Sequence, residues 1–313
     1  KFTPRISETA RGLWGVYFLF SGACLLAYRW AGMSWADAFM HMCTTMGLGG
    51  FSSHDASFGY WDSHAIEGVA TVFMALAGVS FMRYFIVLRH RTLRPLINDR
   101  EIRTYVVVLV VSIVVVALLL AAHNVVDSFP EALRTAAFHV VSVATTTGYA
   151  STDYAQWPVF APVLLLFLGC FVSCAGSTGG GIKLVRMVLL VKQARRELVR
   201  IIHPRVVNPV TLSGVVMPTS VMTAVLGYML IYGAATMGLT MVLLFTGLDI
   251  VTAFSAVVAT VNNIGPGLGE VGPASNFGVL STVQIWVLSF AMLLGRLELL
   301  TVLVLFTGHF WRK

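Results

Sequence analysis

Residues 131–148 read Glu131-Ala-Leu-Arg-Thr-Ala-Ala-Phe-His-Val-Val-Ser-Val-Ala-Thr-Thr-Thr-Gly148, a short and weakly amphipathic segment that ends in a polar turn. Two further stretches have the same form. When the glycines are aligned, Thr44-Thr-Met-Gly47 and Asn262-Asn-Ile-Gly265 fall on Thr145-Thr-Thr-Gly148, with spacings of 101 and then 117 residues. Self-similarity of this kind indicates a chain built from three related units.

The three segments are too short to cross a membrane. Each predicts a helix of about 10–14 residues, or ~15–20 Å, against the ~30 Å of a bilayer core. A helix that stops inside the membrane forms a re-entrant loop, whose irregular backbone must be buried in protein or line a watery cavity. Three such loops would present carbonyl, Thr and Asn oxygens that suit a dehydrated monovalent cation. A plain turn after a helix would explain one copy, but three copies in the same position disfavour it.

The composition places the whole chain in a membrane. Of 313 residues, 57% are hydrophobic and only 11% are charged, whereas soluble domains average ~25% charged residues. This composition excludes most soluble enzymes and also disorder. Apolar windows of the required length predict six spans, at 12–31, 65–88, 105–123, 159–191, 213–246 and 282–307. The fourth and fifth are longer than a bilayer needs, so they are tilted, broken or extended.

The net charge of +7 is unevenly distributed. Positive residues gather after the second and fourth spans and at both ends: Arg89, Arg91, Arg94, Arg100, Arg103, Lys192, Arg195, Arg196, Arg200, Arg205, Lys1, Arg5, Arg11, Arg312 and Lys313. Positive residues favour the cytoplasmic side. The opposite loops hold two arginines, Arg29 and Arg134, and nine of the fourteen acids: Asp37, Asp55, Asp62, Glu67, Asp127, Glu131, Asp153, Asp249 and Glu270. An acidic outer mouth concentrates cations, although acidic residues that lie in the outer loops without any such role would give the same pattern.

The three turns resemble the filter loops of the Trk/Ktr/HKT superfamily of potassium transporters. The matching stretches are 44–55, 145–154 and 262–272, together with Gly176-Ser-Thr-Gly-Gly-Gly-Ile-Lys183 and Leu293-Leu-Gly-Arg-Leu-Glu298. Together these stretches are similar to the TrkH-type subunit of bacteria, and the likeness covers essentially all of the chain. The resemblance implies an all-α integral membrane protein of the bacterial cytoplasmic (inner) membrane, with span–pore helix–filter loop–span units around a central pore for K⁺ uptake. It implies an ion-binding filter at Thr45, Met46, Gly47, Thr146, Thr147, Gly148, Asn263, Ile264 and Gly265.

The family has four units around one pore, whereas this sequence holds three. They cover 1–100, 101–208 and 209–313, and resemble the second, third and fourth units of the family. A three-quarter pore would expose polar loops to lipid. We therefore expect the sequence to be a C-terminal fragment, or one half of a split product, of a larger transporter.

The fourth span is interrupted by four glycines between Gly176 and Gly181. Because each glycine costs ~1 kcal/mol in a helix relative to alanine, regular helix is not expected here. A phosphate-binding loop is excluded, since Lys183 does not follow Gly181 directly and no Ser or Thr follows the lysine. A small-residue face for helix packing is the alternative. The resemblance implies a gate below the filter, formed by Gly176, Ser177, Thr178, Gly179, Gly180, Gly181, Lys183 and Arg296.

Ionisable residues within predicted spans are functional candidates. Arg296 lies in the middle of the sixth span, and the resemblance implies that it faces the pore near the glycines. A structural ion pair with Glu298 is the alternative, although two residues apart on a helix point to different faces. Arg83 is expected to extend toward the inner interface.

Apart from K⁺ at the filter residues, no metal site is predicted in this chain, and neither an enzymatic site nor a cofactor is expected. Cys24, Cys43, Cys170 and Cys174 have no accompanying histidine or carboxylate, and are interpreted as small buried hydrophobes. An intramembrane enzyme is one alternative function, because Gly267-Leu-Gly-Glu270 is similar to the Gly-x-Gly-Asp element of membrane aspartyl proteases. A non-conducting scaffold is another.

The resemblance also implies partners. They are a cytosolic, TrkA-like subunit with nucleotide-binding domains and a second copy of the chain; nucleic acid is not expected. The basic stretches 89–103 and 192–205 would dock the subunit or contact anionic membrane lipid. Met46, Thr147 and Ile264 differ between the loops, so we expect imperfect discrimination of K⁺ from Na⁺.

Overall fold

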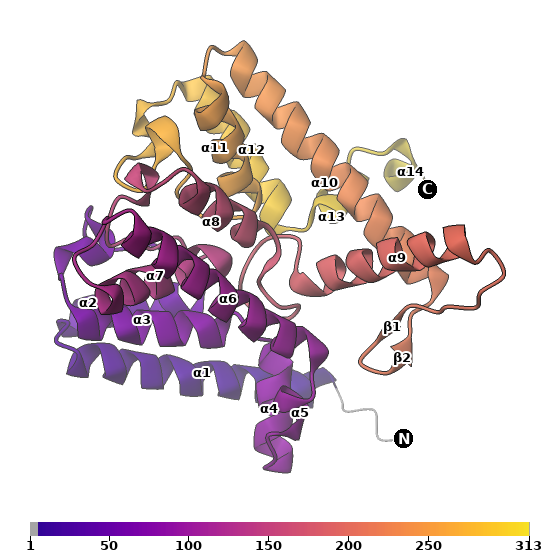
Figure 1. Cartoon of the computed structure of the whole chain (residues 1–313), viewed down its shortest axis with the longest axis horizontal. Coiled ribbons are helices and arrows are strands. Elements are labelled where there is room, and N and C mark those ends of the chain that lie inside the picture. Colours follow the sequence, from indigo (N-terminus) through magenta and orange to yellow (C-terminus); the bar gives the residue numbers. More distant parts are fainter. Residues whose placement is uncertain (1–5, 313) are drawn as a thin grey trace.

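The computed structural model describes residues 6–312 and is almost entirely helical (Figure 1). Lys1, Arg5 and Lys313, which the sequence places among the cytoplasmic charges, lie outside the described residues. Within them, three helices are long and apolar enough to cross a membrane: α1 (Ile6–Trp30), α6 (Arg100–Ala122) and α10 (Thr219–Phe245). A bent pair of helices provides a fourth crossing if it is counted as one span.

Each long helix is followed by a short one that packs against it: α2 (Trp35–Met46), α7 (Phe129–Ala144) and α11 (Ile250–Val261). All three begin at a side chain that accepts a hydrogen bond from the first-turn backbone, namely Ser34, Ser128 and Asp249. Such N-caps satisfy amides that have no partner within the helix. The predicted length is right for α2 and α11, with 12 residues each, but too short for α7, which has 16.

All three returning spans are broken. α3 (His64–Ala77) and α4 (Phe81–His90) meet at 85°. Residues 172–183 separate α8 (Phe160–Phe171) from α9 (Leu184–Ile202), and 297–298 separate α12 (Thr282–Arg296) from α13 (Leu299–Val304). The glycine-rich break was predicted correctly. The predicted spans at 65–88 and 282–307 contain breaks at 78–80 and 297–298 that were not predicted, whereas the long fifth span is one unbroken helix, α10.

The remaining elements are small. An antiparallel hairpin, β1 (Thr211–Leu212) and β2 (Val215–Val216), follows α9. The rest are α5 (Arg94–Ile97), α14 (Gly308–Trp311), η1 (Ser57–Tyr60), η2 (Tyr154–Gln156), η3 (Gly269–Val271) and η4 (Phe277–Val279). These segments lie in connections or near the C-terminus, so the helices define the architecture.

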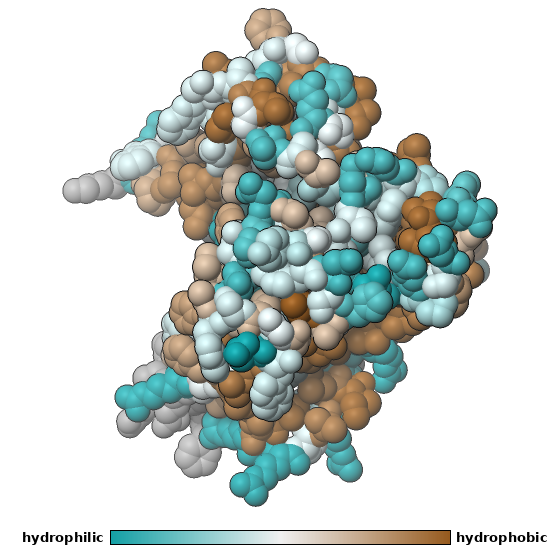
Figure 2. Space-filling view, turned by 90° about the vertical axis from the view of Figure 1, so that its left-hand side faces the viewer, coloured by the Kyte–Doolittle hydropathy of each residue, from teal (hydrophilic) through white to brown (hydrophobic). Residues whose placement is uncertain are grey.

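The core surrounds α7, which contacts α3, α6 and α8 and buries most of its residues. By contrast, the long helices expose large apolar side chains, for example Phe18, Val110 and Leu230. Figure 2 views the left-hand end of Figure 1, where hydrophilic residues gather across the middle and a band of hydrophobic residues lies below them. A polar end between apolar flanks fits a protein that is surrounded by lipid.

Candidate functional site

The turns that follow α2, α7 and α11 share one backbone geometry. In each, an amide donates over 2.8 Å to the carbonyl five residues earlier, with the pairs Gly49–Thr44, Thr147–Ser142 and Ile264–Ala259. Each turn also holds two residues of positive φ separated by one other: Leu48 and Gly50, Thr146 and Gly148, Asn263 and Gly265. We call residues 47–51, 145–149 and 262–266 the first, second and third re-entrant turns.

This shared geometry corrects the sequence alignment by three residues in the first unit. The counterpart of Gly148 and Gly265 is Gly50 and not Gly47, so Leu48-Gly49-Gly50 replaces Thr45-Met46-Gly47 as the first matching stretch. Thr45 and Met46 form the last turn of α2, and Gly47 caps it. The Thr45 hydroxyl lies 2.7 Å from that of Tyr28, so it is used in packing α2 on α1.

The second turn lies between the other two, and glycine permits the contacts. A Cβ on Gly50 would lie 1.8 Å from the Thr147 carbonyl oxygen, and one on Gly148 would lie 1.9 Å from that of Ile264. Both distances are far below van der Waals contact. Thr147 and Ile264 are buried, whereas Gly49 and Gly265 are exposed. The three turns therefore form an arc that is open between the first and the third.

A cavity of about 570 Å³ occupies the open side. Gly49 of the first turn and Asn263 and Gly265 of the third line it, with Met292 and Arg296 of α12. The cavity thus connects Gly49 of the first turn with Asn263 and Gly265, two of the predicted ion-binding residues, and with Arg296.

Residues 172–183, which we call the glycine loop, contact the end of α2 and the second and third turns. The Thr178 hydroxyl donates to the Met46 carbonyl at the end of α2 over 2.9 Å, and the Gly180 amide donates to the Thr146 hydroxyl over 2.7 Å. A Cβ on Gly180 would lie 2.2 Å from the Asn262 carbonyl oxygen. The loop therefore lies directly against the ends of α2, α7 and α11, and its small residues are needed for that approach.

Two positive side chains donate to carbonyls of the glycine loop. Arg296 Nη1 lies 3.1 Å from the Thr178 carbonyl oxygen, and Lys183 Nζ donates to that of Gly179. Arg296, predicted in the middle of the sixth span, is the last residue of α12, directly before the break that separates α12 from α13. The structure brings the predicted residues Gly176–Gly181, Lys183 and Arg296 together beneath the turns.

The structure also shows which ion pairs Glu298 and Arg83 form. Glu298 pairs with Arg186 over 3.1 Å and makes no ion pair with Arg296. Arg83 was expected to extend its side chain toward the inner membrane interface. It instead forms an ion pair with Asp99.

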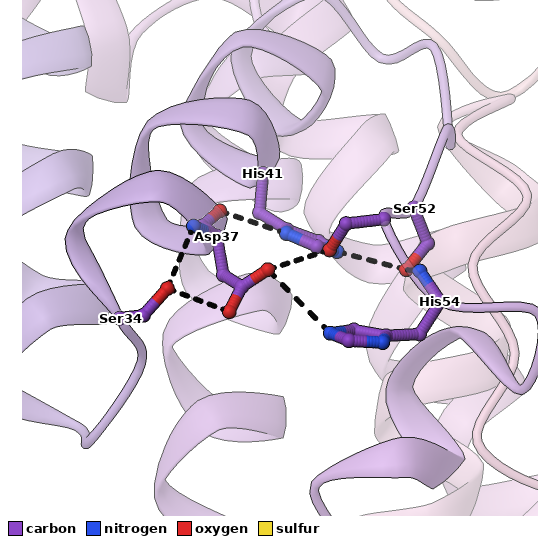
Figure 3. A network of polar contacts seen from close by, with 6 residues as sticks. Ser34, Asp37, His41, Ser52 and His54 are labelled. Carbon is purple, nitrogen blue, oxygen red and sulfur yellow. Dashed lines mark hydrogen bonds and ion pairs between the residues drawn. The ribbon is translucent and has the colours of Figure 1, made fainter.

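The N-terminus of α2 is tied to the segment that follows the first turn (Figure 3). The hydroxyls of Ser34 and Ser53 each donate to the Asp37 carboxylate over 2.7 Å. His54 Nε2 lies 3.5 Å from the same carboxylate. Asp37 therefore joins the start of α2 to the segment that contains Ser53 and His54. These contacts stabilise the first re-entrant turn, which lies between the two.

These contacts predict a pH dependence. Hydrogen bonds from Ser34 and then Ser53 lower the pKa of Asp37. A carboxyl with a depressed folded-state pKa stabilises the fold above its unfolded pKa of about 3.9, and that stabilisation is lost as the pH falls through the lower value. We expect the thermal stability of the unchanged protein to exceed that of Asp37→Asn at pH 7, and the difference to shrink below about pH 4. A difference that is constant down to pH 3 would contradict this role.

Sequence reasoning missed two buried histidines at equivalent positions of α2 and α7. His41 Nδ1 lies 2.8 Å from the Asp37 carbonyl oxygen, and its Nε2 lies 3.0 Å from the Ser52 hydroxyl. In the second unit, His139 Nδ1 lies 2.9 Å from a carbonyl one helical turn earlier, while Nε2 accepts from the amides of Ser151 and Thr152. Each ring thus joins a short helix to the segment after its turn.

Other expectations concern cations and cysteines. Glu67, one of the outer acids, is buried and pairs with Arg134 over 2.9 Å, so it adds no free charge to the outer mouth. Cys24 and Cys174 are buried, but Cys43 is exposed, which corrects the interpretation of all four cysteines as buried. Among residues 6–312, no group of three or more His, Cys, Asp or Glu side chains could hold a metal ion.

Comparison with known proteins identifies relatives over the whole chain. A family model described as "TrkH: Cation transport protein" matches residues 1–313. The Trk system potassium uptake protein TrkH of Salmonella typhimurium is 44% identical over 313 residues, which are 100% of this chain and 64% of that protein. TrkG of Escherichia coli, also named a Trk system potassium uptake protein, is 38% identical with the same coverage.

The crystal structure of the potassium transporter TrkH from Vibrio parahaemolyticus has the same fold. It superposes with a TM-score of 0.94 at 43% sequence identity, covering 99% of this chain and 66% of that chain. The present chain therefore spans about two-thirds of the length of the proteins it matches.

Proposed function

Because this chain belongs to the TrkH family of cation transport proteins, we propose that it forms part of the pore of a potassium uptake system. It is a multi-pass protein of the bacterial inner membrane. Since it spans 64% of its curated relatives, the transport activity proposed is that of the full-length protein that contains it. Within the chain, we propose 1–100, 101–208 and 209–313 as the three pore units.

The shared geometry of the three re-entrant turns carries the proposal. Six residues adopt positive φ in matched pairs, which turns successive carbonyls away from the regular helical direction. Rings of carbonyl oxygens can replace the hydration shell of K⁺. We propose that the ion-binding stretches are 48–50, 146–148 and 263–265, with K⁺ as the transported ion. The N-capped short helices direct their negative C-terminal ends toward the same turns.

The glycine loop is the proposed gate. It contacts the end of α2 and the second and third turns, and its carbonyls accept hydrogen bonds from Arg296 and Lys183. A positive charge held beside the pathway repels K⁺. Displacement of the loop would move these charges and open the path.

Uptake of ⁸⁶Rb⁺ tests the proposal directly. The full-length protein, expressed in bacteria that lack their own K⁺ uptake systems, is expected to restore Rb⁺ accumulation and growth at low K⁺. A bi-ionic reversal potential should show K⁺ permeating better than Na⁺, though imperfectly, because the three turns differ in sequence. Absence of uptake, or Na⁺ permeation equal to that of K⁺, would contradict the assignment.

The structure supports transport over the enzymatic alternative. The hydroxyl of Ser177, the serine of the glycine loop, donates to the Cys174 carbonyl over 2.7 Å, so it is used within the loop. We propose no catalytic role for any residue. Two proposals concern partners. The basic stretches 89–103 and 192–205 bind either a cytosolic nucleotide-binding subunit or anionic lipid. The full-length protein forms a homodimer with a second copy of itself.

A further inference from the structure

The side chain of Arg186, in the first turn of α9, contacts three separate elements. Its Nη1 donates to the Ile182 carbonyl at the end of the glycine loop over 3.3 Å, and its Nη2 forms an ion pair with the Glu298 carboxylate over 3.1 Å. Its guanidinium carbon lies 4.1 Å from the centre of the Tyr228 ring of α10. A cation over an aromatic face is attracted by the quadrupole of the ring. These contacts fix the guanidinium group, so Glu298 is bound to a charge of defined position.

The start of α9 is itself anchored by backbone hydrogen bonds. The Ile182 amide donates to the Cys170 carbonyl of α8 over 2.7 Å, and the Leu184 amide donates to that of Ser173 over 3.0 Å. These bonds hold the second end of the glycine loop on the end of α8 and the residues that follow it. An ion pair that starts from Arg186 therefore ties its partner to the glycine loop.

Glu298 lies in the break between α12 and α13, two residues after Arg296. Its φ is +59°, and a residue with a Cβ keeps such a conformation only where its surroundings determine it. The Glu298 carbonyl accepts a hydrogen bond from the Thr301 amide of α13 over 2.9 Å, while its carboxylate is bound by Arg186. Contacts on both sides of Glu298 thus fix the shape of the break.

We propose that Arg186 and Glu298 are positioning residues that hold Arg296 on the glycine loop. Arg296 donates to the Thr178 carbonyl over 3.1 Å from the last position of α12, directly before the break. By fixing the break against the start of α9, the ion pair keeps the end of α12 at the place from which this hydrogen bond forms. The inference rests on the proposed role of Arg296 and the glycine loop as a gate.

Glu298→Gln in the full-length protein tests the proposal, because glutamine keeps the shape of the side chain and removes its charge. We expect the ⁸⁶Rb⁺ leak from proteoliposomes, with transport inactive, to rise about threefold, as the loss of a partly exposed ion pair allows. The sign of the change is diagnostic. A direct effect of removing a negative charge near the pathway would weaken the attraction for cations and lower the leak. A higher leak therefore reports the position of Arg296.

Further variants assign the effect to the ion pair. Arg186→Gln removes the same pair from its other side, and it serves as the test if Glu298→Gln does not fold. The two changes together should leak no more than the leakier single variant, since both remove one interaction. Glu298→Gln should add nothing to the leak of Arg296→Ala. Glu197→Gln is the matched control and should leave the leak unchanged, because Glu197 is similarly exposed and pairs with arginines of its own helix.

Hydrogen exchange measured by mass spectrometry separates the positioning role from the gate. Peptides covering 297–304 are expected to exchange faster in Glu298→Gln than in the unchanged protein or in Glu197→Gln. Unchanged exchange there would overturn the proposal, and so would an unchanged or lower leak in Glu298→Gln when Arg296→Ala does leak. Faster exchange with a raised leak would support it. Faster exchange with a normal leak in both Glu298→Gln and Arg296→Ala would support the fixing of the break and contradict the gate.

Discussion

Replacing Arg296 by alanine in the full-length protein is expected to raise the flux of K⁺ through the closed pore by at least about tenfold. The guanidinium group lines the cavity between the first and third turns and donates to the glycine loop over 3.1 Å. Two unit charges 4 Å apart repel by roughly 4 kcal/mol at an effective dielectric constant of 20. Removing the charge abolishes this barrier and also frees the Thr178 carbonyl.

Efflux of ⁸⁶Rb⁺ from proteoliposomes, measured under conditions that keep transport inactive, reports this leak. Arg296→Lys retains the charge and should leak much less than Arg296→Ala. Arg312→Ala removes a positive charge from the exposed C-terminal end and provides the matched control. Flux in Arg296→Ala that equals or falls below that of the unchanged protein would contradict the electrostatic role.

The three-unit organisation and the glycine-rich break could be read from local sequence. Hydrophobic windows identify the spans, and four glycines between Gly176 and Gly181 cannot continue a helix. The other two breaks have no comparable local signal. The α3–α4 break contains a single glycine, Gly78, and its backbone groups bond to Cys174 and Gly176, far along the chain. A break that is stabilised by tertiary contacts is not visible in the segment that contains it.

The register of the first turn shows a different limit. Residues 47–50 contain glycine at three of four positions, so aligning glycines could not determine which one matches Gly148. A signal was nevertheless present in the pattern Ala38-x-x-His41, which matches Ala136-x-x-His139. Aligning these histidines gives the register that the structure shows, because each ring joins its short helix to the segment after the turn.

The contacts of the glycine loop could be anticipated only through family resemblance. Its residue types indicate a break, but they do not say which backbone it touches. The bonds from Thr178 to Met46 and from Gly180 to Thr146 join residues 132 and 34 positions apart. Contacts at such separations depend on the packing of whole units.

Replacing Gly148 by alanine is expected to abolish uptake, with ⁸⁶Rb⁺ accumulation falling at least about a hundredfold, while the protein remains folded. Gly148 has a φ of +87°, and an added Cβ would lie 1.9 Å from the Ile264 carbonyl oxygen. The left-handed conformation alone costs an alanine ~1–2 kcal/mol. The contact requires the second or the third turn to move as well, so carbonyls of two neighbouring turns would leave the positions from which they are proposed to face the ion.

Gly233→Ala is the matched control, because Gly233 lies within α10 and a Cβ there would meet nothing within 4 Å. Alanine at this position should transport normally, since it favours helix over glycine by ~1 kcal/mol. Circular dichroism and elution as a single species would show that both variants are folded, so that a loss confined to Gly148→Ala reports the geometry of the turns. Normal accumulation in Gly148→Ala would show that the second turn does not line the ion pathway, because a displacement of this size at a carbonyl cage cannot leave conduction unchanged.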